Sequence, residues 1–187
     1  MIKLNLGSGS KIKDGYINVD KYDTFKPEVV HDLEKFPYPF ENDSVDQILM
    51  LHVLEHIGGE SLIFNLIMKE LYRICKNNSI IDIVVPHPRH DDFLSDPTHV
   101  RPITDMTLSL YDKELNLHWK KIGAANSPLA IIHNVNFKII HKTMNLEKDF
   151  EEKFNTGQIT REELDKNIRF YNNVIKSTHF KLKVIKI

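Results

Sequence analysis

The sequence predicts an α/β fold built on an open, mostly parallel sheet. Short runs rich in Val, Ile and Leu alternate with segments of helical periodicity, as strands and helices taken in turn do. The runs are almost continuously apolar, which is typical of parallel strands buried on both faces. A length of 187 residues, with 41% hydrophobic and 27% charged residues, suits one globular domain. We therefore expect a single domain over residues 1–187, with an antiparallel strand at its C-terminal end.

Seven segments are expected to form strands. The first ends at Gly7-Ser8-Gly9, the fifth ends at Pro86, and the last alternates apolar with polar residues, as a strand with one dry face does. In chain order the expected strands are Ile2–Leu6, Tyr16–Asp20, Glu28–Leu33, Val45–Leu51, Ile80–Val85, Val135–Met144 and Phe180–Val184.

Three segments carry helix signals. Glu60–Cys75, between the fourth and fifth strands, has apolar residues at helical spacing. A second helix is expected around Leu110–Ile122. A third begins at the capping box Thr160-Arg161-Glu162-Glu163. Its expected apolar stripe is Leu164, Ile168, Tyr171 and Ile175.

The first two connections between strands are unusually short. Gly7–Gly15 joins the first pair and Lys21–Pro27 the second, whereas a parallel crossover normally needs a dozen residues or more. We therefore expect the first crossover helices to be short or absent. A flank without helices would leave an apolar patch larger than monomers usually expose. Either the chain's own 87–134 region, its C-terminal helix or a second copy would cover this patch, and we expect a two-fold homodimer. The residues of this expected patch are Ile2, Leu4, Leu6, Ile17 and Val19.

Composition excludes several classes of protein. The 25 Lys and Arg nearly balance the 26 Asp and Glu, so no general electrostatic footprint favours nucleic acid as a partner. The single thiol of Cys75 rules out disulfide frameworks and Cys-cluster metal sites, and it fits a reducing compartment. No secretory leader is seen, and no apolar run reaches the ~18 residues that span a bilayer. A cytoplasmic location without membrane contact is expected.

Residues suited to a nucleoside follow the first three strands in order. Gly7 and Gly9 come after the first strand, where missing side chains let a ligand approach the backbone. Asp20 ends the second strand, and its carboxylate can accept hydrogen bonds from two ribose hydroxyls. Asp32-Leu33 could hold an adenine ring. The alternative is a plain turn with solvated acids, but the ordered trio favours a nucleoside.

Features of phosphate binding are missing. Ile12 stands where a dinucleotide fingerprint has its third glycine, and the sequence has no Gly-Lys-Ser/Thr loop. The first crossover is too short for the helix whose N-terminus would hold a pyrophosphate. The expected ligand is therefore an adenosine without phosphates.

Four segments together resemble a known family. They are Leu4–Gly9, Gly15–Asp20, Phe36–Asp46 and His52–Ile57. Over about residues 2–86 the chain resembles the class I S-adenosylmethionine-dependent methyltransferases, which implies a Rossmann-like fold and S-adenosyl-L-methionine as cofactor. Asn5 departs from the acid that many relatives carry. The resemblance and the strand-end pattern together assign the cofactor to Asn5, Gly7, Ser8, Gly9, Asp20, Asp32, Leu33 and His52.

Histidines and acids near the ends of the fourth and fifth strands are candidates for handling the methyl acceptor. A base is needed where the acceptor begins protonated, and histidine suits that role near neutral pH. We expect His52, His87 and His99 to be catalytic, and 87–134 to be an insertion that forms the acceptor pocket. An ordinary solvated loop is the alternative. The residues expected to bind acceptor are His90, Asp91 and Arg101.

The expected acceptor is an oxygen or nitrogen of a small molecule, such as a sugar or sugar nucleotide. Leu51-His52-Val53-Leu54 stands where enzymes that methylate nucleic-acid amino groups carry an Asp/Asn-Pro-Pro-aromatic motif. Cys75 lies late in an amphipathic helix and is expected to pack rather than act as a nucleophile. Two rivals remain: a non-catalytic module that binds S-adenosylmethionine or S-adenosylhomocysteine, and an unrelated α/β protein that binds a nucleotide by its phosphates.

One further motif admits two interpretations. If helical, His52, Glu55 and His56 would share one face, and with His87 or His90 they could hold a divalent metal. The commoner interpretation, which we adopt at this point, is structural: Glu55 and His56 are hydrogen-bonded near the cofactor and no metal is bound.

Overall fold

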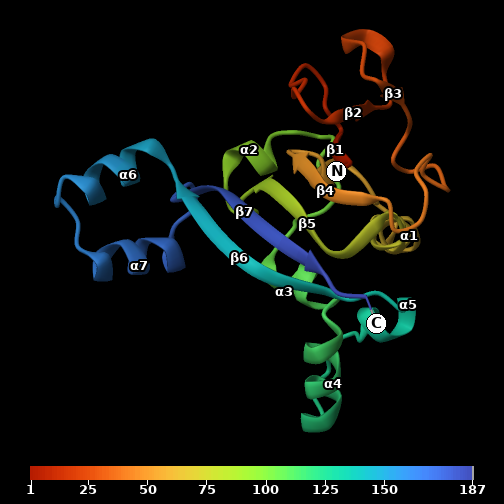
Figure 1. The fold of residues 1–187 in the computed structure, drawn as a ribbon. Helices are drawn as coiled ribbons and strands as arrows, with labels where there is room; N and C mark the ends of the chain where they lie inside the picture. Colours follow the sequence, from red (N-terminus) through yellow and green to blue (C-terminus); the bar gives the residue numbers. More distant parts are fainter. Residues whose placement is uncertain (187) are drawn as a thin grey trace.

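The computed structural model describes residues 1–186. These residues contain one seven-stranded sheet with the strand order β3-β2-β1-β4-β5-β7-β6 (Figure 1). Strands β1 to β5 run parallel, β7 is antiparallel to β5, and β6 is antiparallel to β7. This confirms the expected mostly parallel sheet with antiparallel pairing at its C-terminal end. The strands are β1 (Lys3–Leu6), β2 (Ile17–Asp20), β3 (Val29–Val30), β4 (Val45–Leu51), β5 (Cys75–Pro86), β6 (Phe137–Leu146) and β7 (Ile175–Val184).

The helices lie mainly in the second half of the chain. No α-helix precedes α1 in the described residues, and the β2–β3 link holds only the 3-10 turn η1, as the short connections predict. Across residues 1–186, every helix is too short or too polar to span a bilayer. The helices are α1 (Ser61–Ile74), α2 (Asp91–Leu94), α3 (Asp105–Ser109), α4 (Lys113–Ile122), α5 (Leu129–His133), α6 (Lys148–Asn155) and α7 (Arg161–Phe170), with 3-10 turns η1 (Asp23–Phe25) and η2 (Leu54–His56).

Several boundaries differ from those expected. β3 keeps only two residues, although one further main-chain hydrogen bond, from His31 N to Asp20 O, continues the contact with β2. The capping box of Thr160 and Glu163 opens α7 as predicted, but α7 ends at Phe170. The prediction that the apolar stripe of this helix continues beyond Ile168 is therefore wrong. Tyr171 is extended and exposed, and Ile175 begins β7. Helices α2, α3, α5 and α6 are not predicted from the sequence.

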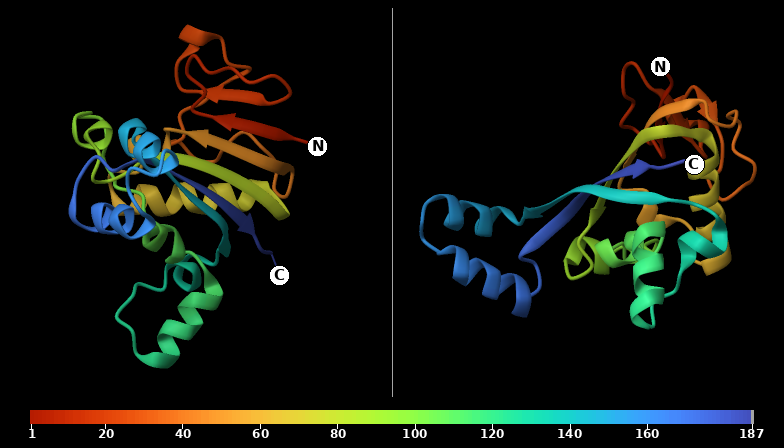
Figure 2. Two further views of the ribbon diagram at one scale, coloured as in Figure 1. Left: turned by 90° about the vertical axis from the view of Figure 1, so that its left-hand side faces the viewer. Right: turned by 60° about the horizontal axis from the view of Figure 1, so that its bottom comes forward.

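One face of the sheet is covered by helices. Figure 2 shows α1, α3, α4 and α5 on the same side of the strands. The expected apolar patch is wrong, because Leu4, Leu6 and Val19 point to this side and are fully buried in the core. Ile17 packs partly buried against the same core, and Ile2 is 37% exposed just before β1. The short crossovers leave the opposite face of the sheet without helices instead. The apolar patch from which a homodimer is inferred is therefore not exposed, and the homodimer itself stays a prediction.

The opposite face carries a ladder of polar side chains. Asn5 and Asn18 are neighbours across β1 and β2, and Asn5 Nδ2 donates to Asn18 Oδ1 at 2.7 Å. Further along, the buried Asp82 of β5 accepts from Gln47 Nε2 at 3.2 Å and lies 3.0 Å from His179 Nε2. Lys181 Nζ is 3.2 Å from the same carboxylate. Cross-strand hydrogen bonds thus satisfy this face where covering helices are missing.

Asp82 should make stability depend on pH. Burial raises the pKa of its carboxyl, but hydrogen bonds from His179, Lys181 and Gln47 lower it more, so the folded pKa lies below the ordinary value. A lowered folded pKa adds stability above the unfolded pKa of about 3.9, and that stability is lost as the pH falls through the folded pKa. We expect Asp82→Asn to lower the free energy of unfolding near pH 6, because the amide lacks the negative charge. The loss should be only about 1 kcal/mol, because the amide keeps one acceptor oxygen.

The measurement is urea unfolding of wild type and Asp82→Asn at several pH values. Their difference should shrink between pH 6 and pH 3. Asp165→Asn is the matched control, since Asp165 forms an exposed ion pair with Arg161 that contributes little. A difference that stays constant to pH 3 would contradict the role given to the Asp82 charge.

Candidate functional site

A cavity of about 470 Å³ lies at the carboxyl ends of β1, β2 and β4. Ligands of open α/β sheets bind at this edge. Its lining includes six of the eight residues expected to bind cofactor, namely Gly7, Gly9, Asp20, Asp32, Leu33 and His52. The structure therefore brings together residues that are up to 45 positions apart in the sequence, from Gly7 to His52.

A larger cavity of about 560 Å³ lies elsewhere. Asn42, Asp43 and Arg73 line it, at the amino-terminal end of β4 and the carboxyl end of α1. It contains none of the expected site residues, and it lies at the edge of the parallel strands that does not usually bind ligands. Size alone thus does not identify the site.

Two glycines give the cavity a backbone floor. Gly7 has φ +66°, and a Cβ there would lie 2.6 Å from Val53 Cγ2, so the β1 loop packs directly on Val53. Gly9 has φ +48°, and no heavy atom lies within 4 Å of where its Cβ would be. A side chain at position 9 would project into open space beside the cavity lining. This part of the site therefore suits a ligand that approaches the main chain closely.

Asp20 is held ready to accept further hydrogen bonds. Gly9 N donates to Asp20 Oδ2 at 2.8 Å, and Tyr22 N donates to Asp20 Oδ1 at 2.9 Å. Each carboxylate oxygen has a second lone pair that these bonds leave free. Two neighbouring hydroxyl groups, such as those of a ribose, fit this arrangement.

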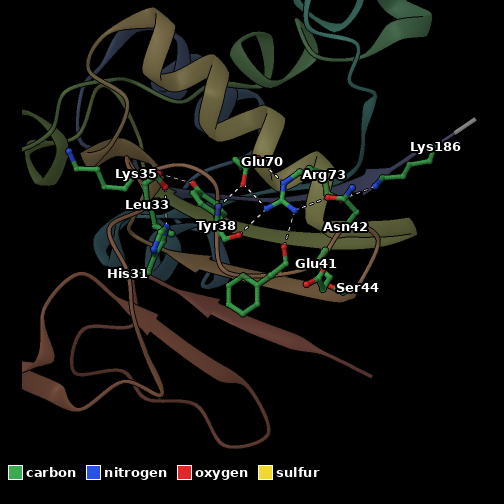
Figure 3. Close-up of polar contacts among 11 residues, drawn as sticks. His31, Leu33, Lys35, Tyr38, Glu41, Asn42, Ser44, Glu70, Arg73 and Lys186 are labelled. Atoms are coloured by element: carbon green, nitrogen blue, oxygen red, sulfur yellow. Dashed lines mark hydrogen bonds and ion pairs between the residues drawn. The ribbon is translucent and has the colours of Figure 1, made fainter.

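Leu33 is positioned from α1 rather than by a crossover helix (Figure 3). Tyr38 Oη donates to Leu33 O at 2.8 Å, and Tyr38 N donates to Glu70 Oε2 at 2.7 Å. Glu70 also accepts two hydrogen bonds from the Arg73 guanidinium, at 2.8 and 2.7 Å. Because paired Arg–carboxylate bonds fix geometry, α1 anchors the β3–β4 loop and its cavity residue.

Arg73 serves the same loop in a second way. Its Nη2 donates to Tyr38 O at 3.0 Å, and its Nη1 donates to Phe40 O at 2.9 Å and to Asn42 Oδ1 at 2.8 Å (Figure 3). Loop carbonyls that no helix or strand satisfies are thereby paired.

Two residues expected to contact the cofactor do not line the cavity. Asn5 Nδ2 donates to Asn18 Oδ1 and, at 2.9 Å, to Lys11 O, so it shapes the β1–β2 loop. Ser8 is buried, and its hydroxyl has no hydrogen-bond partner among the described residues. Direct cofactor contact by Asn5 and Ser8 stays a prediction.

The cavity also contains residues that the sequence reading missed. Tyr22 precedes η1, Phe25 is its last residue, and the two are 61% and 48% exposed. Two aromatic residues in a short polar turn directly after the strand-end Asp20 are a signal that could have found them. The other missed lining residues are Lys21, Thr24, His31, Glu34, Val53, Ile57 and Thr98, whereas His56, which the sequence places near the cofactor, lines the cavity too.

The His52 motif is not one helical face. Only Leu54–His56 forms a 3-10 turn, and His52 lies outside it with φ +55°. The condition for a shared helix face is therefore not met, although His52 Nδ1 still lies 3.5 Å from Glu55 Oε1. The expectation that Glu55 is hydrogen-bonded is wrong, because both of its carboxylate oxygens lack a hydrogen-bond partner among the described residues. The ring that packs on His56 belongs to His99, with ring centroids 4.5 Å apart.

His87 lies in a different cavity. It lines a space of about 240 Å³ together with Arg89, Asp105 and residues of β6 and β7, among them Lys142 of β6. Burial, and then the charges of Arg89, His90 and Lys142, lower the pKa of His87 below its ordinary value. A neutral imidazole at neutral pH can accept a proton, so the group is chemically able to act as a base.

The three residues expected to bind acceptor are engaged within the chain. His90 Nε2 lies 3.0 Å from Glu147 Oε2, and its Nδ1 accepts from Asp92 N at the start of α2. Asn173 pairs twice with Asp91. Arg101 donates to Gly58 O and lies over the Phe64 ring. None of the three lines the 470 Å³ cavity, and their binding of acceptor stays a prediction.

Neither family models nor curated proteins match the sequence. Solved structures do match the fold. A SAM-dependent methyltransferase from Archaeoglobus fulgidus is 18% identical, with a TM-score of 0.61 over 97% of this chain and 85% of that one. An S-adenosylmethionine-dependent methyltransferase from Mesorhizobium loti is 14% identical, with a TM-score of 0.51 over 97% and 90%.

A third structure, the 16S rRNA methyltransferase KamB, is 11% identical, with a TM-score of 0.51 over 99% of this chain and 88% of that one. These likenesses show that the chain has the fold of S-adenosylmethionine-dependent methyltransferases. The expected Rossmann-like fold is thereby confirmed.

Proposed function

We propose that this chain is an S-adenosylmethionine-dependent methyltransferase that methylates an oxygen or nitrogen of a small molecule, such as a sugar or sugar nucleotide. One observation carries the proposal. Within the methyltransferase fold, the cavity at the carboxyl ends of the strands gathers Gly9, Asp20, Leu33 and His52, the residues that the sequence assigns to the cofactor.

These residues fit the cofactor by their chemistry. Asp20 offers free acceptor lone pairs to ribose hydroxyls, Gly9 leaves room against the main chain, and buried Leu33 offers an apolar wall. When bound, the cofactor supplies an electrophilic methyl group on sulfur. The chain then has to align an acceptor lone pair with that methyl group and to take up a proton where the acceptor carries one.

His52 is the histidine we propose as base. It lines the cofactor cavity, and its side chain is 45% exposed. His52 Nδ1 lies 3.5 Å from the buried carboxylate of Glu55. His87 and His99 remain proposals for the same step, with His87 serving an acceptor held in its own cavity.

A second candidate function is a binding module of the same fold without catalysis. The observation that favours it is that His90, Asp91 and Arg101 are engaged in contacts within the chain, so these three residues do not form an acceptor site together. The role of 87–134 as an acceptor insertion, a homodimeric state and a cytoplasmic location are also retained as proposals.

A thermal-shift screen tests the cofactor assignment. S-adenosylmethionine and S-adenosylhomocysteine are each added at about ten times their dissociation constant, which stabilises the native state by about 1.4 kcal/mol. NAD and ATP are added at the same concentrations. For a chain of this size the midpoint should rise by about 3–6 °C with the first two ligands. NAD and ATP should leave it unchanged.

The screen separates the two candidate functions when it is followed by an assay of S-adenosylhomocysteine release over a panel of sugars and sugar nucleotides. Binding with release supports the enzyme, and binding without release supports the module. A shift with NAD or ATP alone would overturn both.

A further inference from the structure

Three potential metal ligands meet at the wall of the cofactor cavity. Glu55 and His56 come from η2, and His99 comes from the loop after α2. One ligand atom from each residue lies within 4.8 Å of the other two. The loops are brought together by the main chain, because Val100 N donates to Glu55 O at 2.9 Å.

Glu55 is the unusual member of this group. Its side chain is 1% exposed, and both carboxylate oxygens lack a hydrogen-bond partner among the described residues. The nearest basic group, His52 Nδ1, is within ion-pair distance at 3.5 Å but makes no hydrogen bond. A buried carboxylate without hydrogen bonds is costly, so the position calls for a positive charge.

The two histidines have their tautomers set by outer partners. His99 Nδ1 lies 2.8 Å from Phe93 O, and since a carbonyl only accepts, Nδ1 carries the proton. The Thr98 hydroxyl donates to Asp96 Oδ1 at 2.6 Å, so Thr98 Oγ1 accepts from His56 Nδ1 at 2.9 Å. In both neutral rings Nε2 is left with a free lone pair.

This arrangement is the one found around protein-bound metals. Ligating histidines usually donate their second nitrogen to a carbonyl or to a group held by a carboxylate, which fixes the ring and the tautomer. His99 and His56 each have such a partner. Asp96 Oδ2, 3.9 Å from His99 Nε2, adds a further negative charge beside the cluster.

We propose that Glu55, His56 and His99 bind one divalent transition-metal ion. Two imidazoles and one carboxylate suit Zn²⁺ or Co²⁺, whereas Mg²⁺ and Ca²⁺ prefer oxygen ligands throughout. Three protein ligands leave a coordination position open. His56 and Thr98 line the 470 Å³ cavity, so the ion lies at its wall. The site stands on these contacts alone and does not depend on the methyl donor.

The probe is Co²⁺, whose visible absorption reports its ligands. Protein freed of metal with a chelator is titrated with Co²⁺ and then with Zn²⁺ or Mg²⁺. We expect one Co²⁺ per chain, an absorption band distinct from that of the aqueous ion, displacement by Zn²⁺ and no displacement by excess Mg²⁺. An unchanged aqueous spectrum, or displacement by Mg²⁺ as effective as by Zn²⁺, would overturn the proposal.

Variants locate the site. His99→Ala should weaken Co²⁺ binding by more than about 100-fold, since even outer partners of metal ligands contribute about 10–100-fold. Thr98→Val removes the hydroxyl that accepts from His56 Nδ1 and donates to Asp96, and should weaken Co²⁺ binding by about 10–100-fold. Glu55→Gln, in which the side chain keeps nearly the same size and shape, tests the site by the same Co²⁺ titration if His99→Ala does not fold. It should also weaken Co²⁺ binding.

His141→Ala is the matched control. His141 and His179 form another histidine pair, with ring centroids 5.7 Å apart on the polar face of the sheet. This variant should bind Co²⁺ like wild type. A loss as large as that of His99→Ala would place the ion at the His141 pair and refute the site at Glu55.

Discussion

Gly58→Ala is expected to lower the free energy of unfolding by about 2–5 kcal/mol. Gly58 joins η2 to α1 and has φ +69°, a conformation that costs an L-residue about 1–2 kcal/mol. A Cβ at this position would lie 2.8 Å from Phe64 Cα, and a backbone atom of α1 cannot move aside cheaply. Such overpacking adds about 1–3 kcal/mol. Chemical denaturation followed by circular dichroism measures the loss.

Gly15→Ala is the control that separates the two contributions. Gly15 has φ +77°, but no heavy atom lies within 4 Å of its Cβ position. This variant should therefore show only the backbone cost of about 1–2 kcal/mol. Equal losses in the two variants would contradict the close contact between Gly58 and Phe64.

Asp20→Ala should weaken the binding of S-adenosylmethionine by about 1–3 kcal/mol, or about 5–150-fold. The substitution leaves ribose hydroxyls without an acceptor. It also removes the acceptor of the hydrogen bonds that Gly9 N and Tyr22 N donate to the Asp20 carboxylate. Isothermal titration calorimetry gives the dissociation constants. Asp20→Asn should lie between wild type and Asp20→Ala, because the amide keeps one acceptor oxygen.

Asp23→Ala controls for a general change of charge near the cavity. Asp23 lies in η1, three residues from Asp20, but does not line the cavity. Its loss should leave the affinity unchanged. Wild-type affinity in Asp20→Ala would remove the ribose assignment, whatever the other residues do.

The sequence predicts those parts of the molecule that depend on local patterns. Strand β4 has the expected bounds, Val45–Leu51, and α1 differs from its expected span by one residue at each end. Both have patterns that do not depend on distant contacts. Gly9 and Asp20 were found for a related reason: the carboxyl ends of neighbouring parallel strands must meet at one edge.

The missed features depend on contacts between distant segments. Nothing near Glu55 in the sequence indicates that His99 lies beside it, because a hydrogen bond from Val100 brings the two loops together. Likewise, Glu70 and Arg73 read as an ordinary helix pair at i, i+3. Their function in holding the Tyr38 loop appears only when α1 is packed on the sheet.

The short β3 has a consequence for local unfolding. Its ladder with β2 contains two residue pairs, Val19–Val29 and Asp20–Val30, and no helix of the described residues braces the β2–β3 link. Regions with few pairs and little burial open at a lower free energy than the core. Part of the binding free energy of any nucleoside on Asp20 is therefore used to keep β2 and β3 paired. Such a ligand would also oppose local unfolding of this edge of the sheet.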